Sequence, residues 1–315
     1  MVYDTALILF GLILVAKGGD LFVDASVYLG QLFRIPRFVI GGTLVSLATT
    51  TPELAVSAIA SSAGDSGIAL GNAVGSCVCN IGLIVGAVAL LMPVEVERRD
   101  LLRRAAWMLS AGVLVVAFTW DGTLSRPLAG VLLALAFAYL VWDYLGIRAL
   151  RRDDPNLDPS VDSTALLGQA AQFVLGAVLI VLGSNLLVDS GSAVARALGA
   201  PSVIIGLSVV AVGTSLPELV TGVTAVRKGV PDLSLGNIIG ANVLNLFLIV
   251  GLSGAIRPLT LDLFTQVYSF GWLGLFFVAV LGLVVRTGRL HRGGGALLLG
   301  LWLTYISGLA VVALG

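Results

Sequence analysis

The sequence consists of long hydrophobic runs separated by short polar segments. Ten of these runs are long enough to cross the apolar core of a bilayer as helices. They are residues 4–32, 37–63, 67–92, 101–120, 126–147, 166–195, 202–226, 233–256, 264–285 and 295–314. The polar, proline-containing segment 151–165 separates five runs from five. The pattern therefore predicts an all-α integral membrane protein with ten transmembrane helices.

The composition fits the same class, because 58% of the residues are hydrophobic, 11% are charged and the mean hydropathy is +1.04. The net charge is zero, so no basic field favours nucleic acid. The lone histidine, His291, is expected in a solvated loop, which argues against a histidine-built metal site. Cys77 and Cys79 point to different helix faces, so we expect apolar fillers rather than a disulfide. No basic segment precedes the first run, so residues 4–32 are expected to be a mature span rather than a signal peptide.

One constant shift of 165 residues relates the two halves of the sequence. It aligns residues 49–53 (TTTPE) with 214–218 (TSLPE), and 71–80 with 236–245. It also pairs Gly11 with Gly176, Gly18 with Gly183, Asp24 with Asp189, Pro36 with Pro201, and Trp107 with Trp272. Because each half has five spans, the second copy must enter the membrane upside down. We therefore expect two five-helix inverted-topology repeats, residues 1–150 and 166–315, with a binding site between them at the midplane.

Basic residues in the loops and at the ends of the apolar segments give an independent view of the topology. Those on the side of the linker 151–165 are Arg34, Arg37, Arg98, Arg99, Arg103, Arg104, Arg148, Arg151, Arg152, Arg227, Lys228, Arg286, Arg289 and Arg292. Only Arg126, Arg196 and Arg257 fall on the other side. The positive-inside rule then predicts a plasma (inner) membrane protein with a cytoplasmic linker and both termini outside.

Each half carries one glutamate, Glu53 or Glu218, inside an otherwise apolar span. A carboxylate in hydrocarbon is costly unless it is neutralised, so two at equivalent positions imply bound cations or protons. Pro52 and Pro217 interrupt the helical hydrogen bonds before them and free backbone carbonyls. Hydroxyl side chains precede each proline. Carbonyl, hydroxyl and carboxylate oxygens are hard ligands, the set that suits sodium and calcium.

The span after each glutamate carries a polar stripe. Asn72, Ser76 and Asn80 are four residues apart and share one helical face. The equivalent positions in the second half are Asn237, Ala241 and Asn245. We expect the asparagines both to line the site and to hold the helices together, beside glycine packing faces.

Four further charged residues lie within the spans: Lys17, Asp20, Asp24 and Asp189. Lys17 and Asp20 are one turn apart and could form an ion pair within the helix. All four lie outside the proline-broken segments. Structural or entrance roles are therefore favoured over ion binding.

At these residues the chain resembles the calcium/cation antiporter superfamily, specifically its prokaryotic sodium/calcium exchanger branch. The α-repeats of that family contain Gly-Thr-Ser-x-Pro-Glu followed by Gly-Asn-x-x-Gly-Ser-Asn-x-x-Asn/Asp. This sequence is similar at 48–53 with 71–80 and at 213–218 with 236–245, within α-1 and α-2 motifs at 41–91 and 206–256. The resemblance implies a metal site with Glu53 and Glu218 as carboxylate ligands. The other implied ligands are Thr49, Thr50, Ser76, Asn80, Thr214, Ser215 and Asn245, with the backbone carbonyls of Ser46 and Ala211.

The function implied by the resemblance is secondary antiport of calcium against sodium by alternating access. It implies no enzyme activity and no cofactor beyond the transported ions. The lipid bilayer is the expected surrounding, and no protein partner is required. Ala241 and Asn245 stand where well-studied members have Ser and Asp. The site then has two formal negative charges, which balance one calcium or two sodium ions.

Three other functions compete with this one. The proton-coupled branch of the superfamily usually has a glutamate soon after the Gly-Asn pair, but residues 73–76 and 238–241 contain no acid. Sodium coupling is therefore favoured, and a proton-coupled calcium or divalent-cation antiporter is the alternative. A passive channel would use the same ligands but carry current without a counter-ion gradient. An intramembrane hydrolase would need a nucleophile with a base, or a metal-binding histidine motif, and the predicted spans offer neither.

Overall fold

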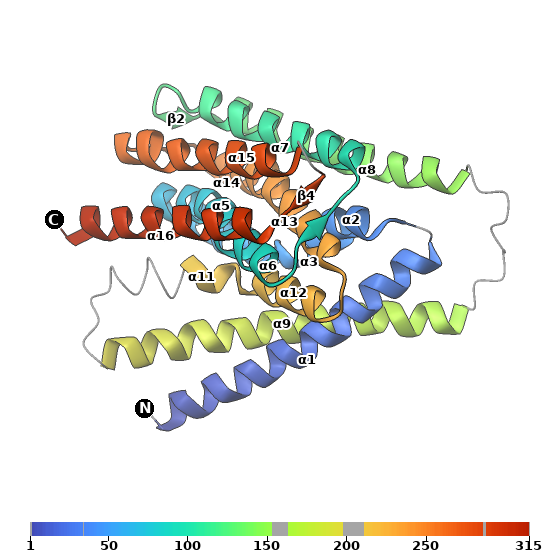
Figure 1. Cartoon of the computed structure of the whole chain (residues 1–315). Coiled ribbons are helices and arrows are strands. Elements are labelled where there is room, and N and C mark those ends of the chain that lie inside the picture. Colours follow the sequence, from blue (N-terminus) through green and yellow to red (C-terminus); the bar gives the residue numbers. More distant parts are fainter. Residues whose placement is uncertain (1, 34, 153–162, 198–210, 286–287, 315) are drawn as a thin grey trace.

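The computed structural model describes residues 2–33, 35–152, 163–197, 211–285 and 288–314, and these residues are almost entirely helical (Figure 1). The elements before the linker are α1 (Val2–Leu32), α2 (Arg37–Ile40), η1 (Gly41–Val45), α3 (Ser46–Thr49), α4 (Thr51–Ala63), α5 (Ser66–Cys79), η2 (Asn80–Val85), α6 (Gly86–Leu91), β1 (Val94–Glu95), α7 (Arg98–Phe118), β2 (Thr123–Leu124) and α8 (Arg126–Arg152). Those after it are α9 (Ser163–Ala197), α11 (Ala211–Thr214), α12 (Leu216–Arg227), α13 (Pro231–Leu244), η4 (Asn245–Ile249), α14 (Val250–Ile256), β3 (Leu259–Thr260), η5 (Thr265–Ser269), α15 (Phe270–Val285), β4 (Arg289–Leu290) and α16 (Arg292–Leu314). The label η denotes a π-helical segment.

The membrane spans follow the hydrophobic pattern closely. Among the described residues, eight helices are long and apolar enough to cross a bilayer. A further span is broken, Arg37–Thr49 and Thr51–Ala63 meeting at a bend of 42°. The predicted span 202–226 lies partly outside the described residues, and its described part is α11 and α12. The prediction of an all-α, multi-pass membrane protein is confirmed.

The helices that carry the polar stripes lie in the centre of the molecule. In the most hydrophobic stretch of the spans Ser66–Leu91 and Pro231–Ile256, 72% and 83% of the residues are buried. In the other continuous spans the share is 17–33%. Around this centre, α7, α8 and α15 lie on one side, and the long pair α1 and α9 lies on the other (Figure 1). The stripes are therefore shielded from lipid by the remaining helices.

Close backbone contacts between glycines hold α1 against α9. A Cβ atom on Gly11 would lie 3.0 Å from the carbonyl oxygen of Gly183. A Cβ on Gly18 would lie 2.9 Å from that of Gly176. Small residues allow this approach, as is typical of helix packing in membranes. The two contacts exchange positions under the shift of 165 residues, because Gly11 corresponds to Gly176 and Gly18 to Gly183.

Two short antiparallel ladders join loops from opposite halves of the chain. β1 pairs with β4, Val94 lying opposite Leu290. β2 pairs with β3, Leu124 lying opposite Leu259. Each ladder ties one half to the other at an end of the helix bundle.

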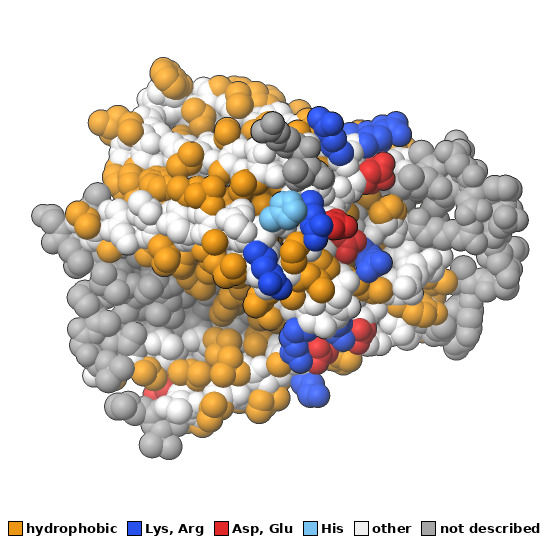
Figure 2. Space-filling view, viewed as in Figure 1, with side chains coloured by type: hydrophobic (Ala, Val, Ile, Leu, Met, Phe, Trp, Pro, Cys, Tyr) orange, Lys and Arg blue, Asp and Glu red, His pale blue; other side chains and the backbone are white. Residues whose placement is uncertain are grey.

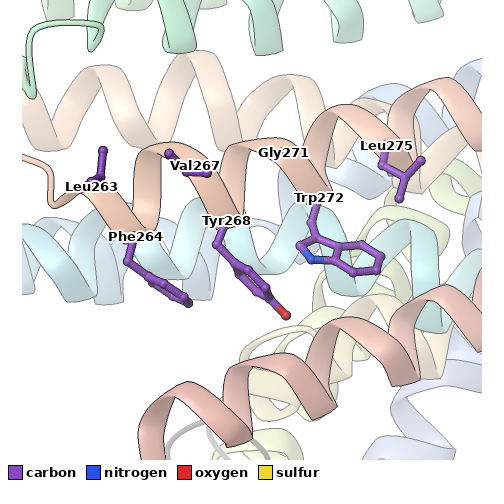
Figure 3. Close-up of a pocket in the computed structure, with 7 residues that line it drawn as sticks. All are labelled: Leu263, Phe264, Val267, Tyr268, Gly271, Trp272 and Leu275. Atoms are coloured by element: carbon purple, nitrogen blue, oxygen red, sulfur yellow. The ribbon is translucent and has the colours of Figure 1, made fainter. Parts of the chain in front are cut away.

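The surface is that of a protein surrounded by lipid. Large apolar side chains such as Val113 and Val278 are 65% and 66% exposed. On the face shown in Figure 2, hydrophobic side chains are spread along the helices, and Lys and Arg gather in a band toward one end of them. His291 is exposed, as expected. A groove of about 620 Å³ on α15 and the segment before it is lined by Tyr268, Trp272 and apolar neighbours, and includes none of the predicted ligands (Figure 3).

Arg104 corrects one detail of the charge analysis. The sequence counts it among the basic residues at the cytoplasmic side, outside the apolar interior. In the structure it lies within α7 and is only 3% exposed, because Asp143 of α8 neutralises it. A basic residue near a predicted span end therefore need not reach water.

Gly236→Ala is expected to destabilise the protein, because a Cβ at this position would lie 2.0 Å from the Phe38 carbonyl oxygen, a backbone atom that cannot turn aside. Overpacking of this kind costs roughly 1–3 kcal/mol. The measurement is the thermal unfolding temperature of the detergent-purified protein. Gly300→Ala, on an exposed position of α16 with nothing within 4 Å, is the control and should leave that temperature unchanged. Equal stability of the two variants would contradict the packing.

Candidate ion-binding site

Both glutamates lie in the first turn of a helix that follows a break. The first break falls at Thr50, between α3 and α4, and the second at Ser215, between α11 and α12. A proline and the glutamate, Glu53 or Glu218, then occupy the first turn of α4 or α12. The free N–H groups and the positive end of the helix dipole favour a carboxylate at this position. The local sequence therefore places each acid at a helix N-terminus inside the membrane.

Threonine side chains cover the backbone exposed by the first break. Thr50 Oγ1 donates to the carbonyl oxygen of Ser46 at 2.6 Å, and the Thr50 N–H donates to the same oxygen at 2.9 Å. Thr49 Oγ1 lies 3.4 Å from it. The Ser46 carbonyl, expected as an ion ligand, thus already accepts protein donors. The break is stabilised by its own hydroxyls, independently of any ion.

Most of the predicted ligands are buried. Ser46, Glu53, Asn80 and Ser215 are fully buried, and Glu218 and Asn245 are 1% exposed. Thr49, Thr50 and Ser76 are 2–3% exposed. Thr214 is half-buried, and Ala211 begins α11.

Buried oxygens without a hydrogen-bond partner concentrate at these positions. Eleven buried side-chain polar atoms in the described part of the chain have no partner. Seven of them are oxygens of predicted ligands: both Glu53 oxygens, Glu218 Oε2, Ser76 Oγ, Asn80 Oδ1, Ser215 Oγ and Asn245 Oδ1. Buried polar atoms are normally satisfied, so a cluster of orphaned acceptors requires an explanation. Acceptors without donors are what a bound cation needs.

The two motifs meet at one place. Thr49 Oγ1 donates to Asn237 Oδ1 at 3.2 Å, and its side chain lies against Glu218. Asn80 Nδ2 donates to Asn242 Oδ1 at 3.0 Å. Each of these contacts joins residues from different halves. The first contact joins the first broken span to the second polar stripe, and the second joins η2 to α13.

The two carboxylates lie close enough to interact electrostatically. Among the described residues, neither Glu53 nor Glu218 forms an ion pair with Lys or Arg. Their charge is therefore not cancelled by a permanent basic neighbour. Two such acids require a mobile cation or proton.

Two π-helical segments at the site were not predicted from the sequence. η2 begins at Asn80 and η4 at Asn245, which are equivalent under the shift of 165 residues and are both predicted ligands. π-Helical turns are rare and occur frequently at functional sites. The extra residue in the turn changes the face on which the following side chains lie. No residue type in these segments marks such a turn, so only the structure reveals it.

Asn72 tethers two helices through its amide nitrogen. Its Nδ2 atom donates to the Glu53 carbonyl oxygen at 3.1 Å and to Ser57 Oγ at 2.9 Å. It holds α5 against the start of α4. The tethering role expected of the asparagines is confirmed here.

The other charged residues within the spans lie elsewhere. Asp24 pairs with Lys228 at 2.8 Å and Asp20 lies 3.8 Å from the same ammonium group, while Asp189 is exposed. The structural interpretation of Asp20 and Asp24 is therefore confirmed. Cys77 and Cys79 are buried free thiols, as expected.

The arrangement of orphaned oxygens on and around two acids, between broken helices, is that of a membrane protein that binds cations. The sequence model of the family described as sodium/calcium exchanger protein matches residues 3–145 and 168–311. The chain therefore belongs to the sodium/calcium exchanger family, whose function is cation-exchange antiport.

Individual relatives cover nearly the whole chain. The chain is 34% identical over 316 residues to the inner membrane protein YrbG of Escherichia coli (strain K12), covering 98% of this chain and 97% of the relative. It is 35% identical over 292 residues to the sodium/calcium exchanger MaX1 of Methanosarcina acetivorans, covering 81% and 83%. A solved structure of the sodium-calcium exchanger NCX_Mj, soaked with 10 mM Na⁺ and 10 mM Sr²⁺, matches with a TM-score of 0.84 and 28% identity, covering 97% of this chain and 98% of the other. Both named exchangers are transporters rather than enzymes.

Ser76→Ala is expected to weaken calcium binding by about tenfold, because it removes one oxygen from the cluster without creating a clash. Calcium protection of the purified protein against thermal unfolding measures the effect. Ser62→Ala removes a hydroxyl that is exposed and bonded to its own helix, at Ala58, and should behave as wild type. Equal calcium protection in both variants would remove Ser76 from the site.

Proposed function

We propose that this protein exchanges calcium for sodium across the inner membrane, and that Glu53 and Glu218 are the two charged ligands. The observation that carries the proposal is a set of seven unpartnered oxygens, three of which belong to two acids that have no basic partner among the described residues. These unpartnered atoms are all oxygens, which are hard ligands and favour sodium and calcium over softer metals. The transported ions are the only metals the function needs.

Charge balance explains why the two ions would exclude each other. Two carboxylates are neutralised by one calcium or by two sodium ions. Ala241 and Asn245 contribute no further charge to the cluster. A site loaded with one kind of ion is therefore closed to the other, and the empty site keeps two uncancelled charges in a low-dielectric interior. Exchange rather than net transport follows, because only an ion-loaded site can change orientation without exposing uncancelled charge to a low-dielectric environment.

Alternating access between two inverted repeats is the mechanism we propose. It is supported by contacts between the two halves that follow the shift of 165 residues. Gly11 meets Gly183 while Gly18 meets Gly176, and Cys77 Sγ lies 3.8 Å from the carbonyl of Asn242, the residue 165 positions later. Such reciprocal contacts are expected around a pseudo-twofold axis. In this scheme α1 and α9 move as a pair against the core that holds the site.

The orientation proposed is a cytoplasmic linker with both termini outside. The band of Lys and Arg toward one end of the helices supports it through the positive-inside rule (Figure 2). Sodium coupling is supported by the kinship with MaX1 and NCX_Mj, both named sodium/calcium exchangers. Proton coupling is the alternative, since a proton also neutralises a carboxylate.

Proteoliposomes loaded with sodium are expected to take up radioactive calcium when diluted into sodium-free buffer at equal pH on both sides. Uptake should vanish when sodium is replaced by choline, because no counter-ion would then return through the site. The measurement is the initial rate under sodium, potassium and proton gradients imposed one at a time. Uptake driven by the pH gradient alone would transfer the assignment to proton exchange.

Glu53→Gln and Glu218→Gln are each expected to reduce sodium-driven calcium uptake at least a hundredfold, because one charge cannot neutralise calcium in a buried site. Glutamine keeps the shape of the side chain, so the fold should remain. Glu95→Gln is the matched control: its carboxylate is 68% exposed and pairs only with Arg289 in the described residues. Near-normal rates in both site variants would refute the proposed centre.

A further inference from the structure

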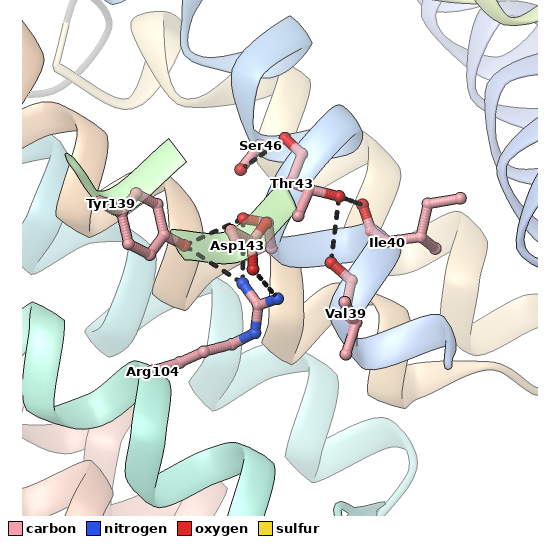
Figure 4. A network of polar contacts seen from close by, with 8 residues as sticks. Val39, Ile40, Thr43, Ser46, Arg104, Tyr139 and Asp143 are labelled. Atoms are coloured by element: carbon pink, nitrogen blue, oxygen red, sulfur yellow. Dashed lines mark hydrogen bonds and ion pairs between the residues drawn. The ribbon is translucent and has the colours of Figure 1, made fainter. Parts of the chain in front are cut away.

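A second polar cluster lies deep in the molecule and consists of Arg104, Tyr139 and Asp143, none of which is a predicted ligand. Figure 4 shows it together with the segment that carries Thr43 and Ser46. Arg104 of α7 and Asp143 of α8 form an ion pair in which each side chain is 4% exposed. Tyr139, one turn before Asp143, is fully buried, and its hydroxyl lies 3.2 Å from Arg104 Nη1. A buried ion pair is weak evidence for stability alone, because the desolvation it requires offsets most of its attraction. A further role is therefore expected.

The cluster holds one backbone atom of the first broken span. Arg104 Nη1 donates to the carbonyl oxygen of Gly42 at 3.3 Å. Tyr139 Oη donates to the same oxygen at 3.1 Å. Gly42 belongs to the π-helical segment η1, one turn before Ser46. Two donors on one carbonyl, one of them charged, fix its position more strongly than an ordinary helical bond.

α13 packs against the same part of η1. A Cβ on Gly240 would lie 2.4 Å from the Gly42 carbonyl oxygen, and a Cβ on Gly41 would lie 2.2 Å from the Leu233 carbonyl oxygen. A Cβ on Gly42 itself would lie 2.5 Å from Arg104 Nη1. Contacts with the backbone of α13 and with the guanidinium thus clamp this part of η1.

A short chain of bonds leads from this clamp to the site. Ser46 Oγ donates to the carbonyl oxygen of Thr43, the residue after Gly42, at 3.0 Å. The Ser46 carbonyl in turn accepts from Thr50 Oγ1 at 2.6 Å. Thr50 is the residue at the break, three positions before Glu53. A displacement of Gly42 would therefore move the oxygens of Ser46 and Thr50.

The cluster is specific to one half. The shift of 165 residues maps Arg104, Tyr139 and Asp143 onto Ser269, Thr304 and Gly308, none of which is charged. The space beside Gly308 is occupied by Tyr268, whose hydroxyl would lie 2.1 Å from an added Cβ. That hydroxyl donates to the Tyr305 carbonyl at 2.7 Å.

We propose that Arg104, Tyr139 and Asp143 form a positioning cluster for the cation site, which sets the Ser46 and Thr50 oxygens by holding the Gly42 carbonyl. Asp143 keeps Arg104 in place and cancels its charge, so that the guanidinium does not repel the cations. The cluster is distinct from the ligands and acts through η1. The inference rests on the proposed function, because the site it positions is the calcium and sodium site.

Tyr139→Phe tests the proposal with a small change. It removes one donor to Gly42 but keeps the ring, which lies 5.6 Å from Trp107 and 6.1 Å from Trp142 between centroids. The half-saturating calcium concentration for sodium-driven uptake is expected to rise about three- to tenfold, with the maximal rate within about twofold of wild type. Calcium protection against heating, measured without any gradient, should move to higher calcium by the same factor.

Tyr268→Phe is the matched control, since it also removes a phenolic hydroxyl bonded to a backbone carbonyl. Its half-saturating calcium should equal that of wild type, even where its unfolding temperature falls. The double variant Arg104→Gln/Asp143→Asn removes both charges together and should shift calcium dependence in the same direction as Tyr139→Phe. An unchanged calcium dependence in folded Tyr139→Phe overturns the inference. Wild-type protein that shows calcium protection but no sodium-driven uptake would instead overturn the proposed coupling, and the protection curves would still decide the role of the cluster.

Discussion

Two carboxylates buried in a membrane protein without a basic partner constrain everything around them. Neither Glu53 nor Glu218 is bound by a cation of the protein in the described residues, and both are nearly or fully buried. Such groups are tolerated only when a mobile ion neutralises them. The helix breaks place them at helix N-termini, where the backbone partly offsets their cost. Hydroxyl and amide oxygens near the acids have no hydrogen-bond donor in the protein, so they remain available to a cation.

Much of this could be predicted from the sequence, because the relevant physics is periodic or repeated. Hydrophobic length determines a span, so nearly every span was located within a few residues. The repeat of TTTPE and TSLPE at a constant shift marked both acids, and proline before each acid marked the breaks. These features depend on a residue's own chemistry and its neighbours in the chain.

Contacts between distant segments could not be predicted in this way. From the sequence, Arg104 is a basic residue at the end of a span. Its partner Asp143 lies thirty-nine positions later in the chain, and only the folded structure brings the two together. The π-helical turns at Asn80 and Asn245 carry no distinctive residue type. The Ser46 carbonyl, which the family resemblance implies as an ion ligand, also accepts from Thr50, because this side chain folds back onto its own turn. In each case, the missing information was which group in the folded chain reaches an atom, not which residue was present.

The two halves share their acids but not the residues that support them. Arg104, Tyr139 and Asp143 hold the first broken span, and Lys228 ties α12 to Asp24 of α1, whereas the counterpart of Lys228 is Ala63. In an inverted repeat, identical halves would give two orientations of equal energy. Contacts made in one half only must stabilise one orientation relative to the other. In an exchanger this energy difference between orientations must stay small compared with the energy of neutralising the two acids. If it were larger, ion binding would no longer decide which orientation is populated. The ion pair of Lys228 lies near the surface, where such pairs contribute about 0–1 kcal/mol. In the proposed mechanism the Arg104 cluster belongs to the core that stays fixed. Under that mechanism the unequal contacts would adjust the balance between the two orientations, and the acids would still control it.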